Sequence, residues 1–162
     1  MRFVADGMLG GLARWLRMLG YDTEYDSKMD DNTLLNHSQR DGTILLTRDQ
    51  ELHDRARKKS LSSVLILGKT EEDSLAQLGK SLGISLEIDM AATRCPKCGS
   101  PLREESKDDA SDSVPPASLK LYDRFWKCTA TNCGKTYWVG SHWKNIRQTL
   151  ENTRKKVEVP ET

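Results

Sequence analysis

Four cysteines in the second half of the chain have the spacing of a metal site. Cys95 and Cys98 enclose two residues, and Cys128 and Cys133 follow after a gap of 29 residues, with four residues between them. A glycine after each pair allows a tight turn, so both thiolates of a pair can face one ion. Four thiolates would fill the tetrahedral shell of Zn²⁺ and exclude water, so the sequence predicts one structural zinc ion. Free or redox-active thiols, or His142 as a substitute ligand, fit the spacing less well.

Aspartates recur at equivalent places in the first half of the chain. Asp6 and Asp49 each follow a short apolar run. Asp30 and Asp31 open a predicted helix. In parallel α/β sheets, sites form outside the carboxyl ends of the strands, where these carboxylates could meet and bind Mg²⁺ or Mn²⁺. Such an ion can activate water at a phosphodiester, but aspartate is also a favoured helix N-cap, and for any one of these residues a cap is the simpler explanation.

Strands and helices that could position these residues alternate along the first half. Short apolar runs predict strands at residues 2–5, 43–46 and 64–67, and residues 22–25 are expected to form a further short strand. Leucine spacing and turn signals predict helices at about residues 9–19, 30–41, 49–58 and 71–82, with Gly20 and Gly83 as stops. Alternation of this kind is typical of an α/β domain with a parallel sheet and right-handed crossovers, here residues 1–92.

A second, smaller module is predicted at residues 93–147, around the cysteines. Its segment 104–118 is polar and acidic and ends near two prolines, which indicates a flexible loop inside the module. A C-terminal helix is predicted from about residue 141 to 156, so that residues 148–162 form a helical, basic tail that frays at its end.

Charge is distributed unevenly between the two halves. Residues 1–93 contain 12 basic and 15 acidic residues, whereas residues 94–162 contain 13 basic and nine acidic residues. A basic second half favours a polyanion partner, although a solvated surface can have the same composition. The chain has no apolar run long enough to span a membrane and no apolar signal core at its start, so we expect no membrane partner and a cytoplasmic location.

Several stretches together resemble a known family. They are residues 3–10 and 12–22, Asp30-Asp31, residues 45–49, Gln77-Leu78, residues 94–98, residues 125–128 and residues 137–143. These stretches are similar to the family named after the carboxyl-terminal region of the mut-seven exonuclease, over about residues 2–147. The resemblance implies a PIN-like parallel sheet flanked by helices, followed by a four-cysteine zinc ribbon and a C-terminal helix. Two departures are Gly11, where relatives often have a charged or polar residue, and the wider second cysteine pair.

The resemblance also implies roles for the acidic residues. PIN nucleases gather carboxylates around Mg²⁺ or Mn²⁺, and by position Asp6, Asp49 and one of Asp30 and Asp31 match these ligands. Thr47 matches a hydroxyl position near the same site. The expected activity is therefore metal-dependent, endonucleolytic hydrolysis of RNA.

The basic second half supplies candidate RNA contacts. We expect phosphate contacts from basic side chains and base stacking from aromatic ones. The candidates are Arg14, Lys120, Arg124, Lys127, Lys135, Trp138, His142, Lys144 and Arg147. Transfer RNA, ribosomal RNA and the ribosome are candidate partners, and the sequence favours no particular oligomeric state. The alternative is a non-catalytic RNA-binding or ribosome-associated zinc-ribbon protein, in which the acids only cap helices.

Overall fold

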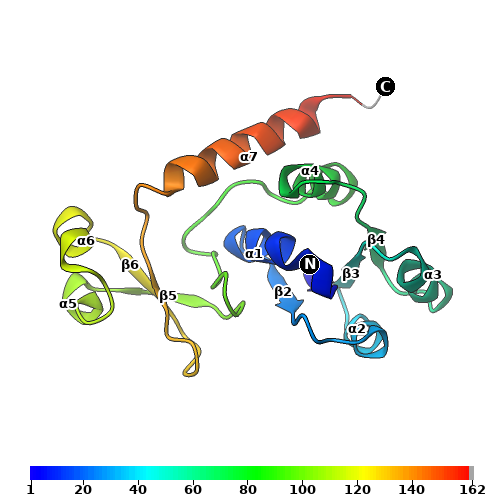
Figure 1. The fold of residues 1–162 in the computed structure, drawn as a ribbon, viewed down its shortest axis with the longest axis horizontal. Helices are drawn as coiled ribbons and strands as arrows, with labels where there is room; N and C mark the ends of the chain where they lie inside the picture. The colour runs from blue at the N-terminus through cyan, green and yellow to red at the C-terminus, as the bar shows by residue number, and fades with distance from the viewer. Residues whose placement is uncertain (161–162) are drawn as a thin grey trace.

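The first half of the chain folds around a four-stranded parallel sheet. The computed structural model describes residues 1–160, and its first sheet has the strand order β2-β1-β3-β4 (Figure 1). The strands are β1 (Arg2–Ala5), β2 (Asp22–Tyr25), β3 (Thr43–Thr47) and β4 (Ser63–Leu65). Strand β1 is central, and its last residue, Ala5, is in register with the last residue of β2 and with Leu46 of β3. The chain segments that leave β1 and β3 therefore start side by side at one edge of the sheet.

Helices cover both faces of this sheet. They are α1 (Gly10–Met18), which a 3-10 turn at Gly7–Leu9 precedes, α2 (Asp31–His37), α3 (Gln50–Lys58) and α4 (Glu71–Leu82). Phe3 and Leu46 pack with α1 and α4, whereas Val4 and Leu45 pack with α2 and α3. Successive strand residues point to opposite faces, so burial of both faces explains why consecutive residues are apolar in the two central strands, at Phe3–Ala5 of β1 and Ile44–Leu46 of β3.

The second module contains a small antiparallel sheet of order β5-β6-β7. Its strands are β5 (Leu102–Glu105), β6 (Phe125–Cys128) and β7 (Thr136–Tyr137). The predicted flexible loop at 104–118 is instead largely ordered as the end of β5, α5 (Lys107–Ala110) and the start of α6 (Pro116–Leu121). Ala110 and Val114 are buried against Phe125, so two small apolar residues in an acidic segment give it a core of its own.

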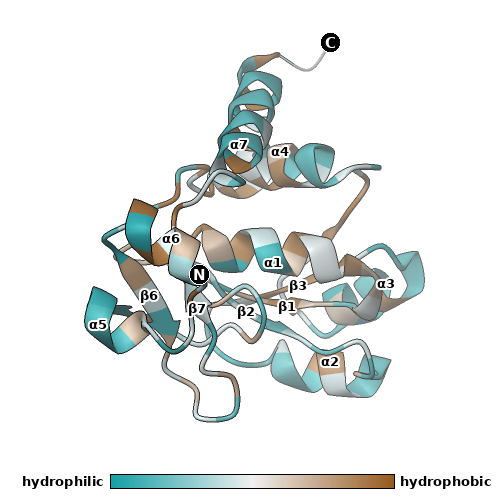
Figure 2. Cartoon of the chain, turned by 60° about the vertical axis from the view of Figure 1, so that its left-hand side comes forward, coloured by the Kyte–Doolittle hydropathy of each residue, from teal (hydrophilic) through white to brown (hydrophobic). Residues whose placement is uncertain are grey.

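The C-terminal helix returns to the first module. Helix α7 (Trp143–Glu158) runs beside α4 in Figures 1 and 2, and Leu150 is buried in the core that α1 and α4 form with the sheet. The predicted tail at 148–162 is thus the continuation of a helix that begins earlier and packs on the first module, and its residues 161–162 lie outside the described range. Among residues 1–160, no helix combines the length and apolar character that crossing a membrane requires.

Candidate functional site

The four cysteine sulfurs converge on one point, as the sequence predicts. All four Sγ atoms lie within 4.8 Å of one another. The Sγ atoms of Cys95 and Cys133 are 3.8 Å apart, and those of Cys98 and Cys128 are 3.4 Å apart. A tetrahedral Zn²⁺ with Zn–S bonds of about 2.3 Å requires sulfur–sulfur distances of about 3.8 Å. Four soft thiolates at this spacing fit zinc and leave no ligand position for a substrate.

The surroundings of the cysteines differ from one thiol to the next. Burial opposes ionisation of Cys98, but hydrogen bonds with Ser100 and with neighbouring thiols lower its pKa to about 6. Burial raises the pKa of Cys128 to about 12. Burial also raises the pKa of Tyr137, so its hydroxyl stays protonated and can donate to the Sγ of Cys95, which is 3.0 Å away. The pKa values of Cys98 and Cys128 thus differ widely, and a bound metal would hold all four cysteines as thiolates.

A buried arginine joins the two modules. Arg17 of α1 is 3% exposed. Its Nε donates to the carbonyl oxygen of Thr23, and its Nη1 donates to the carbonyl oxygens of Pro96 and Lys97, at 3.1 and 3.2 Å. Pro96 and Lys97 form the turn between the first two cysteines, so a side chain of the first module fixes that turn. Burial lowers the pKa of Arg17, and the thiolates of Cys98 and Cys95 oppose this change.

The sequence alone did not point to this role of Arg17. A signal was present in the helix periodicity. Arg17 lies four residues after Ala13 and five after Leu12, on the stripe that α1 buries. Residues four apart share a helix face, so position 17 was due to face the core.

Two of the predicted acidic residues meet at the carboxyl edge of the parallel sheet. The hydroxyl of Thr47 donates to Oδ2 of Asp6 at 2.8 Å and accepts from the amide of Asp49 at 3.0 Å. The amide of Gly7 donates to Oδ1 of Asp6 at 2.6 Å. Thr47 is fully buried, whereas Asp6 is half-buried and Asp49 is exposed. The neighbouring strands β1 and β3 thus place a linked Asp6–Thr47–Asp49 unit at the rim of the sheet.

The other two predicted acids open α2 and have other partners. Asp30 caps the helix by accepting from the amide of Thr33 at 2.8 Å, and this hydrogen bond lowers its pKa. Asp31 forms an ion pair with Arg55 of α3, with an Oδ2–Nη1 distance of 3.5 Å. Asp49 also caps its helix, since its Oδ1 accepts from the amides of Glu51 and Leu52. The capping alternative therefore applies to Asp30 and Asp49, and Asp6 likewise caps the 3-10 turn at Gly7–Leu9 by accepting from the amide of Gly7.

The carboxylates of the acidic unit are oxygen ligands of the kind that a hard cation prefers. Fewer ligand residues gather there, however, than the four cysteines of the other site. Each carboxylate oxygen of Asp6 accepts one hydrogen bond and keeps a second acceptor position, which suits Mg²⁺ or Mn²⁺. Within residues 1–160, the four cysteines are the one group of at least three Cys, His, Asp or Glu side chains close enough to share an ion. A catalytic ion at Asp6 thus stays a prediction.

The predicted RNA contacts fall into different environments. Arg124 pairs with Glu104, and Lys127 pairs with Glu105. Trp138 packs edge-on against Phe125, in the core of the second module. The remaining candidates of the second half are exposed to solvent: Lys120, Lys135, His142, Lys144 and Arg147. Arg14 is also exposed and lines a hollow together with Lys135.

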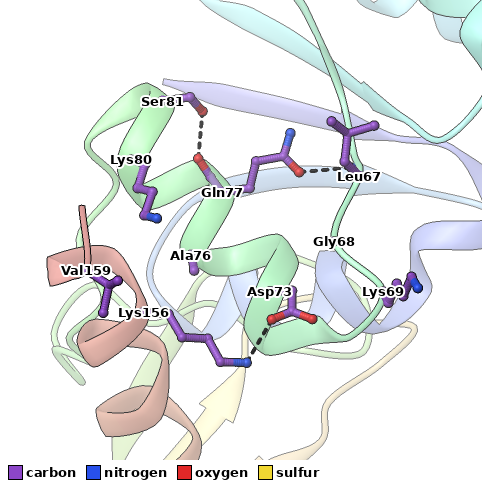
Figure 3. Close-up of a pocket in the computed structure, with 10 residues that line it drawn as sticks. All are labelled: Leu67, Gly68, Lys69, Asp73, Ala76, Gln77, Lys80, Ser81, Lys156 and Val159. Atoms are coloured by element: carbon purple, nitrogen blue, oxygen red, sulfur yellow. Dashed lines mark hydrogen bonds and ion pairs between the residues drawn. The ribbon is translucent and has the colours of Figure 1, made fainter. Parts of the chain in front are cut away.

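Gln77, which belongs to a stretch that resembles the mut-seven family, has a structural role. Its Nε2 donates to the carbonyl oxygen of Leu65, and its Oε1 accepts from the amide of Leu67, so it fixes the chain after β4. Figure 3 shows this residue at the edge of a hollow of about 970 Å³ between α4 and the end of α7. Asp6, Thr47 and Asp49 do not line that hollow.

The fold and the two sites define a class of protein: a parallel α/β module, with acids at the carboxyl edge of its sheet, joined to a four-cysteine metal-site module. More specifically, the chain belongs to the Mut7-C RNAse domain family, whose family model matches residues 1–150. The resemblance seen in the sequence is therefore confirmed, and RNA is the substrate class that this family implies. Comparison with curated proteins finds no match, and neither does comparison with solved structures.

Proposed function

We propose that this protein is a metal-dependent endoribonuclease that hydrolyses RNA phosphodiester bonds. The observation that carries the proposal is the Asp6–Thr47–Asp49 unit at the carboxyl edge of the sheet, in a chain of an RNase domain family. The Thr47 hydroxyl ties the carboxylate of Asp6 to the backbone amide of Asp49, so the ends of two neighbouring strands hold both acidic residues at one edge of the sheet, which separate helix caps would not require.

The side chains of the unit have distinct roles in this proposal. Asp6 and Asp49 would hold Mg²⁺ or Mn²⁺, and Asp31 would join them by leaving its exposed and weak pairing with Arg55. When bound, such an ion supplies an activated water and offsets negative charge on the phosphodiester. Thr47 is a positioning residue, because its hydrogen bond fixes the carboxylate of Asp6 and leaves that carboxylate further acceptor positions.

The second module supports the same function through its zinc-type site and its basic surface. A zinc ion on the four cysteines would stabilise the module and take no part in the reaction, since its shell would be full. Exposed basic residues in the first two turns of α7, Lys144 and Arg147, would contact RNA phosphates. We propose RNA as the partner, and transfer RNA and ribosomal RNA are substrates to test.

A cleavage assay tests the proposal. Labelled single-stranded RNA is incubated with the wild type, with Asp6→Asn and with Asp54→Asn, each with Mg²⁺, with Mn²⁺ and without added metal. Asp54 is an exposed acid of α3 that accepts a hydrogen bond from Gln50, so its substitution is a matched control. We expect metal-dependent cleavage that Asp6→Asn lowers by about 100-fold or more and that the control leaves unchanged.

A second candidate function is binding of RNA without cleavage. The observation that favours it is that Asp30 and Asp49 cap helices while Asp31 pairs with Arg55, so each acid has a structural partner. This function predicts RNA binding by the wild type, no cleavage with either metal, and the same affinity for RNA in Asp6→Asn. That result in the assay above would reject the nuclease.

A further inference from the structure

A second hollow lies where the two modules meet. It has a volume of about 400 Å³ and is open to solvent. Helix α1 contributes Arg14, the end of β2 contributes Tyr25, and the second module contributes Lys97, Lys135 and Tyr137. We call this hollow the junction pocket. It contains basic and aromatic side chains and no acidic one, which is the composition that suits a nucleic-acid backbone.

Three cations of the junction pocket have no acidic partner. Within residues 1–160, no carboxylate oxygen lies within 4.0 Å of the charged groups of Arg14, Lys97 or Lys135. The basic residues Arg124 and Lys127 of the same module, by contrast, are paired. Unpaired cations that face one hollow repel one another, and an anion between them would remove that repulsion.

The pocket is held in place from both sides. Arg17 donates to the carbonyl oxygen of Lys97 and thereby fixes the backbone that carries this lysine. The Nζ of Lys135 lies 5.5 Å from the centre of the Tyr137 ring, which keeps the ammonium group at the pocket wall. Arg17 also lines the pocket, but it is 3% exposed and its guanidinium donates to three backbone carbonyl groups, so Arg17 positions the pocket and is not one of its free cations.

The pocket also adjoins the loop that carries Asp6. The hydroxyl of Tyr25 donates to the carbonyl oxygen of Gly7 at 2.7 Å, and the amide of Gly7 donates to Asp6. Gly10 completes this wall, because a Cβ at that position would lie 2.8 Å from the hydroxyl oxygen of Tyr25. The hydrogen bond from Tyr25 therefore links a wall of the junction pocket to the loop that carries the proposed catalytic carboxylate.

We propose that the junction pocket binds a phosphate group of the RNA strand, so that Arg14, Lys97 and Lys135 hold the strand while Asp6 faces a nearby bond. This inference rests on the proposed function for the choice of RNA. It assigns the second module a part in substrate binding, since two of the three cations come from that module. Tyr25 and Tyr137 offer ring faces for the adjoining ribose or base.

The test measures binding in a background that cannot cleave. A mixed-sequence single-stranded RNA, labelled at its 3′ end, is titrated with Asp6→Asn and with the triple variant Asp6→Asn/Arg14→Gln/Lys135→Gln, and fluorescence anisotropy is followed over a range of salt concentrations. We expect the pocket substitutions to weaken binding by about tenfold at low salt. We also expect the slope of log affinity against log salt to become shallower by about 0.7 for each phosphate that the variant no longer neutralises.

Two control variants separate the pocket from net charge. Lys58→Gln/Lys59→Gln removes two exposed charges at the end of α3, and Lys107→Gln/Lys155→Gln removes two charges that are paired with Asp123 and Glu151. Both are made in the Asp6→Asn background, and both should keep affinity within about twofold of that background. Circular dichroism and zinc content verify that each variant is folded.

The RNA is supplied with a 5′-hydroxyl or with a 5′-phosphate. Equal losses of affinity for both RNAs assign the pocket to an internal phosphodiester, and a loss confined to the second RNA assigns it to a terminal phosphate. Unchanged affinity and salt slope in the pocket variant, or an equal loss in the Lys58/Lys59 control, overturns the inference. If binding depends on the pocket but the wild type never cleaves RNA, the nuclease proposal is rejected and the pocket proposal is supported. If the wild type cleaves RNA but the pocket variant binds it normally, the nuclease proposal is supported and the pocket proposal is rejected.

Discussion

The guanidinium of Arg17 donates to the carbonyl oxygen of Lys97, 80 residues away in the sequence. The same group reaches the carbonyl oxygen of Pro96, and the backbone amide of Arg94 donates to the carbonyl oxygen of Arg17. The contact therefore joins α1 to the turn between the first two cysteines. Because the donor belongs to one module and the acceptors to the other, the metal site and the parallel sheet are parts of one packed structure.

Arg17→Met should destabilise the protein. The change keeps much of the apolar stem but removes the donor to three backbone carbonyl groups, in a place where water has little access. We expect a loss of about 2 kcal/mol or more in the free energy of unfolding, measured by urea denaturation. Arg14→Met, at an exposed position one turn earlier on the same helix, should cost less than about 0.5 kcal/mol. Equal losses in the two variants would show that Arg17 has no special role.

Metal analysis should find one zinc ion per chain. Cys128→Ser removes a buried ligand, so zinc content should fall and the second module should lose its packing around Trp126 and Phe125. Tryptophan fluorescence and hydrogen exchange of β6 report that loss. Asn132→Ser, next to Cys133, changes the same turn without removing a ligand and should keep the zinc. A metal-free protein with unchanged hydrogen exchange in β6 would contradict a structural zinc site.

Much of the first module could be predicted from the sequence alone. Strands β1 and β2 have the predicted bounds, because their short runs are bounded by charged residues and glycine. Helix α4 also has its predicted bounds, since Gly83 adopts a φ of +68° and ends it. Helix α2, however, ends at His37 rather than near Gly42, because residues 38–42 form turns before β3 begins. Local sequence signals thus predict the bounds of most elements. They fail at the end of α2, where a series of turns follows the helix directly.

Tertiary contacts were harder to predict. Segment 104–118 has the composition of a flexible loop, but Ala110 and Val114 bury against Phe125, and only the fold reveals that neighbour. The alternation of strands and helices predicts that Asp6 and Asp49 lie at one edge of the sheet, and they do. It does not predict whether a carboxylate caps a helix, pairs with an arginine or holds a metal, because one aspartate can do each of these.

Thr47→Val should impair both stability and cleavage. Valine has nearly the same shape but cannot donate to Asp6 or accept from the amide of Asp49, so it leaves a partly buried amide and a carboxylate oxygen without their partner. We expect the free energy of unfolding to fall by about 1–3 kcal/mol in urea denaturation. Thr47→Ser keeps the hydroxyl and should retain most of the metal-dependent RNA cleavage that Thr47→Val loses. If the valine variant cleaves RNA as fast as the serine variant, Thr47 does not position the proposed site.

The docking of α7 on α4 should weaken in acid. Lys156 of α7 pairs with Glu72 and Asp73 of α4, with an Nζ–Oδ1 distance to Asp73 of 2.8 Å (Figure 3). The hydrogen bond from Lys156 holds the pKa of Asp73 below its ordinary value of 3.8. A carboxylate with a lowered pKa stabilises the fold fully above its ordinary pKa, and this stabilisation is lost as the pH falls through the lowered value.

Lys156→Gln should therefore be less stable than the wild type at neutral pH, and the difference should shrink as the pH drops below about 4. Thermal unfolding of both proteins at a series of pH values measures this difference. Lys144→Gln is the matched control, because Lys144 lies in the first turn of α7 and no carboxylate within residues 1–160 lies within 4.0 Å of its ammonium group. Its stability should follow that of the wild type at every pH. A stability difference between wild type and Lys156→Gln that persists in acid would place the contribution of Lys156 in its apolar stem rather than in its ion pairs.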